Sequence, residues 1–482
     1  MTAPRARLVA VAALMAGLPL ARLSAQQPDR SHPPVLPPPP ALRVPAVQVT
    51  TLPNGLQVAV VEMHKVPVVD VTLLIDAGAV RDPDSLAGLA TFTATMLQQG
   101  AGARGALDIA DQAAYLGASL ATSASYDAAV ASLHVPTRRL GPALDLLADV
   151  VLRPTFPDSE IARQRDLRRT QILQQRDQPM AMANIAFAAT VFGAAHPYGR
   201  PVSGTEASAA ALTRERVTQF YRSYYRPNSA RLLVVGDVTP AEAAALVTAR
   251  FGGWERADVP AVAEAPAPAA AARTIYLVDK PGAAQSVFRI GLVGVSRATP
   301  DYFALEVLNT ILGGSFTSRL NQNLRETHGY TYGASSQFVM RRQAGPFVAA
   351  SSIVTAKTDS GLIEFMRELR RIRDEAVPDA ELAKAKAYVT LGLPAEFETT
   401  AAAAQQFAEL LQFGLPLDYY DTYIPHIEAV TAADVQRVAR QYLDLDHIDI
   451  VVVGDRTQIQ AGLEALHEGP VVARDMWGQT VR

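Results

Sequence analysis

The eight histidines are the residues of this 482-residue chain best suited to metal binding or acid–base chemistry. No two of them lie three to five residues apart, so no helical face presents a histidine pair to a metal ion. Cysteine is absent, which excludes disulfides, thiolate zinc sites, iron–sulfur clusters and cysteine nucleophiles together. The histidines are His32, His64, His134, His196, His328, His426, His447 and His467.

Phosphate binding and acyl transfer also lack their sequence motifs. The glycine-rich segments 100–105, 252–253 and 313–314 match neither a phosphate-binding loop nor a dinucleotide-binding fingerprint. The chain contains no Gly-x-Ser-x-Gly turn that would expose a serine nucleophile. The 44 basic and 47 acidic residues give a net charge of −3, which argues against nucleic acid as the main partner. The sequence therefore offers no self-contained catalytic centre.

Residues 1–25 have the order of a secretory signal peptide. Arg5 and Arg7 precede an apolar run at 8–21, and Leu23-Ser24-Ala25 offers a small-residue cleavage site. The apolar run is about 14 residues long, whereas a helix needs ~20 to span a bilayer. We therefore expect a mature chain in the periplasm or outside the cell, with no transmembrane segment. The alternative is an uncleaved membrane anchor.

Two low-complexity segments divide the rest of the chain. Residues 26–47 form a proline-rich linker with four consecutive prolines, and residues 256–272 form a second linker rich in alanine and proline. These linkers separate two expected domains, 48–255 and 273–482. Within the domains, residues 212–237 and 430–455 align without a gap at an offset of 218, and eight of 26 positions are identical. This agreement indicates an internal duplication.

The repeat and the patterns around it predict an α+β fold of two similar sandwich domains. Each copy of the repeat reads as a Thr-capped helix followed by an apolar strand, which belongs inside a helix-covered sheet. Strands and helices mix elsewhere without strict alternation. Five arginines of the helix at 158–176 are expected mostly on a solvated face. The expected strands are 55–61, 68–76, 120–135, 286–295, 330–338 and 347–355; the expected helices are 87–98, 107–116, 140–152, 158–176, 302–312, 316–325 and 362–376.

Several segments resemble one peptidase family. Leu52-Pro53-Asn54-Gly55-Leu56-Gln57-Val58 is followed by similar segments at 68–79, 88–97, 153–156 and 196–200. From about residue 50 to 460, the chain resembles the pitrilysin/insulinase family of zinc peptidases, in the branch of mitochondrial processing peptidase and two-domain bacterial relatives. The resemblance implies two homologous α/β sandwich domains of the LuxS/processing-peptidase type, each an antiparallel-rich sheet covered by helices.

The chain departs from this family at the positions that would bind zinc. Active members carry His-x-x-Glu-His on one helix and a glutamate ligand on a later helix. By position, the two histidines fall on Thr91 and Thr95, the general base on Ala94 and the third ligand on Gln171. Hydroxyl and amide groups are poor ligands for zinc, and alanine cannot accept a proton from a metal-bound water. We expect no metal in this chain and no peptidase activity from it alone.

A second family motif is retained in the C-terminal half. Arg325 and Tyr332 match the Arg-x-x-x-Gly-x-x-Tyr signature, whose arginine and tyrosine in the family hold substrate carbonyls and stabilise the oxyanion at the zinc site. Gly329 is expected to end the preceding helix and let the chain enter the strand that carries Tyr332. The alternative for Arg325 is a surface ion pair with Glu326.

The resemblance and the missing ligands together predict a non-catalytic subunit of a heterodimeric zinc peptidase. The partner would be a homologous chain that carries the zinc motif and the zinc ion, and Arg325 and Tyr332 would complete its site. The peptide substrate would bind in extended form at a sheet edge. The alternative is a non-enzymatic peptide-binding or scaffold protein built on the same fold.

Overall fold

The computed structural model describes residues 42–262, 265–268 and 270–481. The predicted signal peptide at 1–25 and residues 26–41 of the predicted first linker lie outside the described residues. Residues 42–482 form one unit. Among the described helices, none combines the length and the apolar character that a membrane crossing requires.

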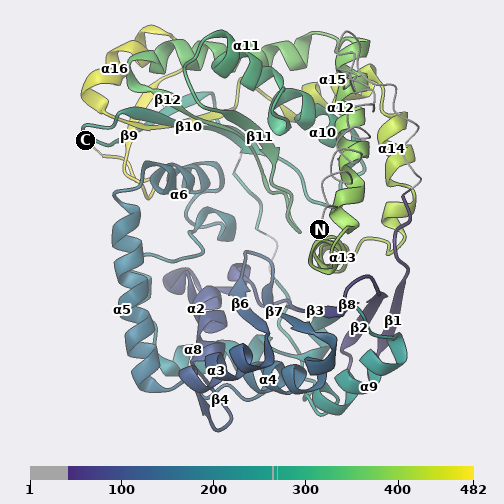
Figure 1. Ribbon diagram of the computed structural model, residues 1–482. Coiled ribbons are helices and arrows are strands. Elements are labelled where there is room, and N and C mark those ends of the chain that lie inside the picture. Colours follow the sequence, from purple (N-terminus) through teal and green to yellow (C-terminus); the bar gives the residue numbers. More distant parts are fainter. Residues whose placement is uncertain (1–41, 263–264, 269, 482) are drawn as a thin grey trace, which may run out of the picture. The chain divides into compact units, whose positions relative to one another are not determined.

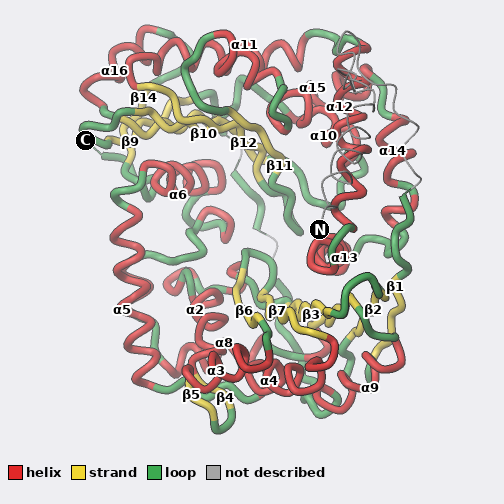
Figure 2. Tube along the Cα trace, viewed as in Figure 1, coloured by secondary structure: helices red, strands yellow, loops and turns green. Residues whose placement is uncertain are grey.

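Two six-stranded sheets form the frame of the molecule (yellow in Figure 2). Neighbouring strands are antiparallel except at β2–β8, β13–β9 and β9–β14, so the expected antiparallel-rich sheets are confirmed. The first sheet has the order β1(Val47–Thr51), β2(Gln57–Glu62), β8(Ala230–Gly236), β3(Val68–Ile75), β7(Ala129–Pro136), β6(Ser119–Ala124). The second has the order β11(Ala334–Phe338), β12(Pro346–Val354), β10(Gln285–Val293), β13(Asp449–Gly454), β9(Thr274–Asp279), β14(Val471–Arg474).

The duplicated segments occupy equivalent places in the two sheets. Helices α8 (Arg214–Tyr224) and α15 (Ala432–Tyr442) each begin after a threonine. The side chain of this threonine accepts the backbone N–H of the third residue of the helix. The strands that follow, β8 and β13, lie inside their sheets and are almost entirely buried. The prediction of a doubly covered central strand is therefore confirmed in both halves.

Each half lends one helix to the sheet of the other half (Figure 1). Helix α6 (Pro179–Phe192), from the first half, packs on β10 and β13 of the second sheet. Helix α13 (Thr400–Phe413), from the second half, packs on β3 and β8 of the first sheet. Apolar side chains of both halves consequently share the same buried clusters, with Phe187 against Val451 and Val453 in one of them. The sequence patterns did not predict either helix.

The other helices agree only in part with the sequence patterns. The first half contains α2(Leu89–Met96), α3(Ala106–Leu116), α4(Leu140–Leu152), α5(Asp158–Gln175), α7(Glu206–Ala210) and α9(Pro240–Phe251) in addition to α8; a two-stranded hairpin joins β4(Gly100–Ala101) and β5(Arg104–Gly105). The second half contains α10(Tyr302–Asn309), α11(Thr358–Asp374), α12(Asp379–Gly392), α14(Tyr423–Ala429) and α16(Arg456–Ala465). Among these helices, α2, α3, α4, α5, α10 and α11 match expected helices, whereas α7, α9, α12, α14 and α16 were not expected from the sequence patterns.

The segment around Tyr332 differs from the sequence-based expectation. A π-helical stretch, Asn321–Thr327, continues the short helix that precedes it, and Gly329 follows with φ of +64°. The helix therefore ends at this glycine as expected. The strand predicted from residue 330, however, begins only at Ala334, so Tyr332 lies in the loop before β11. Within this loop, Thr331 Oγ1 accepts the backbone N–H of Gly333 at 3.1 Å.

The turn between β11 and β12 holds the second half against the first. The guanidinium of Arg341 stacks on Tyr126 and Tyr198, with its central carbon 3.9 Å and 4.4 Å from the ring centroids. The backbone N–H of Arg342 donates to Asp127 at 3.1 Å, and its side chain pairs with Asp76. Stacking and charge pairing together join the two halves at this turn. The described residues of the segment 256–272 lie in neither a helix nor a strand.

Candidate functional site

Helix α2 carries three of the four positions where the resemblance would place zinc chemistry. It begins after Gly88, whose φ of +93° favours glycine and whose missing side chain leaves room for the backbone of Ser203, 2.9 Å from an added Cβ. The carboxylate of Asp82 accepts the backbone N–H groups of Gly88 and Ala90, both at 2.8 Å. Burial raises the pKa of Asp82 to about 7, against the opposing effect of these hydrogen bonds.

The side chains on α2 are engaged in local structure. Thr91 Oγ1 donates to the carbonyl oxygen of Val202 at 2.6 Å, and Thr95 Oγ1 donates to the carbonyl oxygen of Thr91 at 3.0 Å. Ala94 is fully buried in the core. Both threonine hydroxyls thus satisfy backbone carbonyls of their own helix or of the adjacent loop, as Thr residues in helices often do.

Arg168 of α5 contacts the first of these threonines. Its Nη1 donates to Thr91 Oγ1 at 2.9 Å and to the carbonyl oxygen of Ser203 at 3.2 Å. The guanidinium also lies 5.8 Å from the ring centroid of Phe92. Burial lowers the pKa of Arg168, while the charge of Asp82 opposes that shift. Arg168 is therefore not on the solvated face expected for the arginines of this helix. It places a positive charge between α2 and α5.

Gln171 lies one helical turn beyond Arg168 and is exposed. Within the described part of the chain, its amide makes no hydrogen bond to Thr91 or Thr95, and no group of three histidine or acidic side chains is placed to hold a metal ion. Two hydroxyls that donate to carbonyls, one amide and a neighbouring guanidinium do not form a zinc donor set. These residues do not fit zinc.

Arg325 lies at the end of the π-helical stretch and is one-third exposed. Its Nε is 3.4 Å from Glu326 Oε1, so the surface ion pair that the sequence suggested is present. Its guanidinium also stacks on Phe316, 4.3 Å from the ring centroid, and Phe316 itself is 63% exposed. A stacked, partly exposed guanidinium keeps donors available for a ligand while its position is restricted.

Tyr332 is 93% exposed, the largest exposed fraction among the large apolar and aromatic side chains of the described residues. An aromatic side chain with so little contact within its own chain is unusual, because burial of a tyrosine is favourable. No hydrogen bond or ion pair in the described residues joins Tyr332 or Arg325 to the α2 positions. The described part of the structure thus makes no polar contact between the two sets of predicted site residues and leaves Tyr332 exposed and Arg325 partly exposed.

Strand β6 is one of the two edge strands of the first sheet and lies beside α2. Its six residues alternate between exposed and half-buried, and all of them except Leu120 have small side chains. An edge strand of this kind has unpaired backbone N–H and C=O groups that an extended peptide can pair with. The geometry therefore places an unpaired sheet edge next to the helix that carries Thr91, Ala94 and Thr95.

Sequence reasoning did not identify Asp82, Arg168 or Phe316. Arg168 is one of four arginines on a helix without an apolar stripe, so the sequence pattern gave no signal that it would be partly buried. An aspartate shortly before a predicted helix is a candidate cap for that helix. Asp82, however, lies six residues before Gly88, farther than the usual spacing of a cap, because a turn intervenes. Phe316 had been assigned only to a predicted helix.

Comparison with known proteins places the chain beside one group of peptidases. The family model described as Insulinase (Peptidase family M16) matches residues 57–206, and the one described as Peptidase M16 inactive domain matches residues 211–389. An uncharacterised zinc protease of Mycobacterium leprae is 28% identical over 400 residues, which are 82% of this chain and 89% of that protein. The probable beta subunit of the mitochondrial-processing peptidase of Arabidopsis thaliana is 25% identical over 427 residues, 86% of this chain and 79% of that protein.

Solved structures give the same result for the fold. The crystal structure of a peptidase M16 inactive domain from Pseudomonas fluorescens is 27% identical and superposes with a TM-score of 0.80, covering 85% of this chain and 98% of that one. A protease from Helicobacter pylori superposes with a TM-score of 0.81 at 22% identity, covering 86% of this chain and all of that one. The two-sheet architecture is therefore the one found in those proteins.

Proposed function

Because this chain belongs to the insulinase (M16) peptidase family but has no zinc donor set among its described residues, we propose that it is the non-catalytic subunit of a heterodimeric zinc peptidase. The partner would be a homologous chain with an intact zinc motif, and peptide hydrolysis would take place at the partner's metal. Arg325 and Tyr332 of this chain would reach the substrate there. The protein would act in the periplasm or outside the cell, after removal of residues 1–25, with domains at 48–255 and 273–482.

The observation that carries this proposal is the contact between Arg168 and Thr91. Around the positions that the resemblance assigns to zinc binding, Asp82 accepts the backbone N–H of Gly88 at the start of α2, and the apolar side chains of α2 are buried. Beside these positions the guanidinium of Arg168 places a positive charge between the two helices, which would repel a cation. A chain with the peptidase fold and an arginine beside the expected metal position is suited to a role other than binding zinc itself.

The outward placement of Arg325 and Tyr332 supports the role in trans. A phenol 93% exposed in its own chain is suited to contact with another molecule. A guanidinium fixed by stacking on Phe316 can donate two parallel hydrogen bonds to carbonyl or oxyanion oxygens in a water-poor cleft. An extended peptide would be held by backbone pairing to a sheet edge such as β6.

The second candidate is a non-enzymatic peptide-binding or scaffold protein. The ion pair of Arg325 with Glu326 favours it, because an arginine already paired at the surface needs no substrate to explain its position. Under this alternative, β6 would still bind extended peptides, but no partner zinc site would depend on Arg325 or Tyr332.

Co-purification with a zinc-motif relative from the same organism tests the proposal. Both chains are expressed together and separated by size exclusion at micromolar concentration, and zinc is measured in each peak. The proposal predicts one heterodimer peak with about one zinc per pair and none in this chain alone. Separate peaks for the two chains at that concentration would favour the scaffold alternative.

A further inference from the structure

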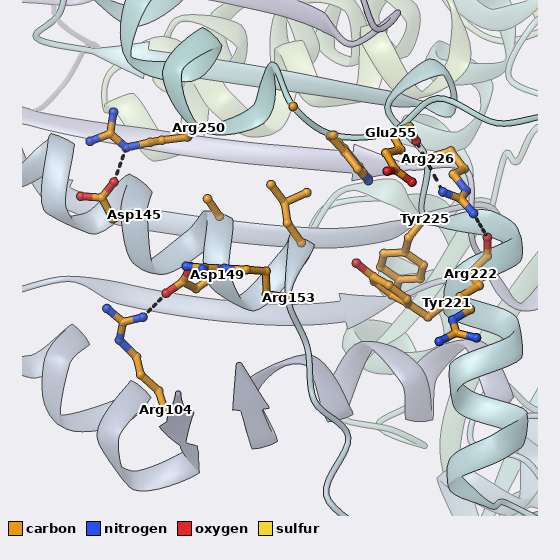
Figure 3. Close-up of a pocket in the computed structure, with 14 residues that line it drawn as sticks. Arg104, Asp145, Asp149, Arg153, Tyr221, Arg222, Tyr225, Arg226, Arg250 and Glu255 are labelled. Carbon is orange, nitrogen blue, oxygen red and sulfur yellow. Dashed lines mark hydrogen bonds and ion pairs between the residues drawn. The ribbon is translucent and has the colours of Figure 1, made fainter. Parts of the chain in front are cut away.

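A pocket of about 800 Å³ lies on the first half, away from the candidate site (Figure 3). Its walls come from the β4–β5 hairpin, α4, α8, the end of α9 and the chain just after it. None of the α2 positions, Gln171, Arg325 or Tyr332 lines it. The pocket is large enough for a small organic molecule.

The charge of the pocket lining is unbalanced. Five arginines and three carboxylates line it, which leaves an excess of two positive charges. The arginines are Arg104, Arg153, Arg222, Arg226 and Arg250. In a chain with a net charge of −3, such a local excess is not a consequence of composition. A concave surface with an uncompensated charge attracts a ligand of the opposite sign.

One buried carboxylate organises two of the arginines. Asp149, only 5% exposed, pairs with both Arg104 and Arg153 from its two oxygens (Figure 3). Arg104 is also held by Gln112, which accepts its Nε–H at 2.6 Å. One negative charge therefore fixes two guanidinium groups whose remaining N–H groups are free of partners in the described residues. This arrangement is pre-organised to accept a further anion.

Two more arginines at the opposite wall have no carboxylate partner among the described residues. Arg226 donates only to backbone carbonyls, at 2.7 Å to Arg222 and at 3.5 Å to Glu255, and its buried Nε makes no hydrogen bond. Arg222 is exposed. Arg250, by contrast, is 2.8 Å from Asp145 and is already compensated.

The floor between these walls is aromatic. The rings of Tyr221 and Tyr225 lie 5.0 Å apart, and Trp254 lines the same pocket. Tyr225 is 2% exposed, and its buried hydroxyl has no hydrogen-bond partner within the described chain. A buried hydroxyl without a partner is costly, so a polar ligand atom would improve the stability of the folded protein.

We propose that this pocket binds a small molecule that carries two negative charges on an aromatic ring, as a phosphate monoester or a dicarboxylate. The two charges match the excess of two, the paired guanidiniums on Asp149 hold one anionic group in bidentate fashion, and the ring lies against the tyrosines and Trp254. The competing explanation is that the arginines form a purely structural network. This site is independent of the proposed function.

Calorimetric titration of the full chain tests the site with two probes that share one ring. Phenyl phosphate represents the phosphate and benzylmalonate the dicarboxylate, at pH 7.5 and low salt, with benzyl alcohol as the uncharged control. We expect at least one dianion to bind and benzyl alcohol not to bind. The stronger of the two dianions identifies the anionic group. Failure of both dianions to bind at 10 mM would overturn the proposal.

Single substitutions localise the binding. Arg153→Gln and Arg222→Gln change exposed side chains, and each should weaken binding of the preferred dianion by about tenfold or more, because each removes a charge-assisted contact. Arg214→Gln is the matched control: it removes an exposed arginine of α8 that pairs with Asp158 outside the pocket. Equal affinities for the wild type and both pocket variants would overturn the proposal, as would an equal loss in the control.

Discussion

At the scale of single residues, the contact between Arg168 and Thr91 predicts that this chain does not bind zinc. Restoring the ligands alone, with Thr91→His, Thr95→His and Gln171→Glu, should leave the protein with less than about one-tenth equivalent of zinc, because the guanidinium repels the cation. Adding Arg168→Ala to the three changes should raise the zinc content of the variant toward one equivalent per chain. Elemental analysis after dialysis measures both. Stoichiometric zinc in the variant that retains Arg168 would contradict this account.

Asp82 makes stability depend on pH. Its carboxyl has a pKa of about 7 in the folded chain against 3.8 for an ordinary aspartate, so the folded state holds a proton that the unfolded state releases between these values. The free energy of unfolding should therefore fall as pH rises through this window and level off above pH 7. Between pH 5.5 and 7.5, the loss in the wild type should exceed that in Asp82→Asn by about 1–2 kcal/mol. Urea unfolding at both pH values checks this, and an equal loss in both proteins would show that Asp82 does not titrate there.

At the scale of elements, most strands and helices were predictable because their patterns have a clear period. The Thr caps and apolar strands of the duplicated segments are examples, and they appear as α8–β8 and α15–β13. Helix α6 is among the helices that were missed, and for this helix the reason is physical. Helix α6 is apolar nearly all round, since it is buried between the two halves, and such a helix shows no stripe.

The candidate site was predictable only in part. The positions of Thr91, Thr95 and Gln171 follow from the family resemblance, but the half-buried guanidinium beside Thr91 does not, because only tertiary packing distinguishes Arg168 from its neighbouring arginines. The expected strand at Tyr332 was wrong because Gly329 and the following loop delay the first strand residue to Ala334. A loop position changes how far a side chain can reach, which sequence patterns do not reveal.

Helix α6 should contribute strongly to stability although it belongs to the other half of the chain. Phe187 is 5% exposed and packs against Val287, Val451 and Val453 of the second half. Phe187→Ala should lower the free energy of unfolding by about 3–5 kcal/mol. Met180→Ala, on the same helix but exposed, should change it by no more than about 0.5 kcal/mol. Denaturant unfolding compares the two, and similar effects would mean that α6 is not a packing element.

At the scale of the whole molecule, the exchange of helices makes the two halves interdependent. Without α13, residues 48–255 would expose the face of their sheet that carries Leu74, Leu233 and Val235. We expect this half alone to aggregate or to bind a hydrophobic dye, and to become soluble when residues 273–482 are co-expressed. A soluble, cooperatively unfolding first half would contradict this interdependence.

The same interdependence gives the molecule a fixed frame from which Arg325 and Tyr332 face outward. The turn between β11 and β12 also joins the two halves, because the guanidinium of Arg341 stacks on Tyr126 and Tyr198. A rigid frame holds catalytic contacts at a constant position, which is what assistance to a partner's site requires. The scaffold alternative would need the rigidity but not the two outward side chains.

Steady-state kinetics of the reconstituted pair tests the central claim most directly. With a peptide substrate and the zinc-motif partner, Arg325→Ala and Tyr332→Phe in this chain should each reduce the rate on the order of 100-fold, with assembly and partner zinc unchanged. Glu326→Ala, the ion-pair control, should have little effect. The account predicts that loss in both variants and normal rates in the control. Wild-type rates from both Arg325→Ala and Tyr332→Phe would show that this chain contributes no group to the partner's chemistry.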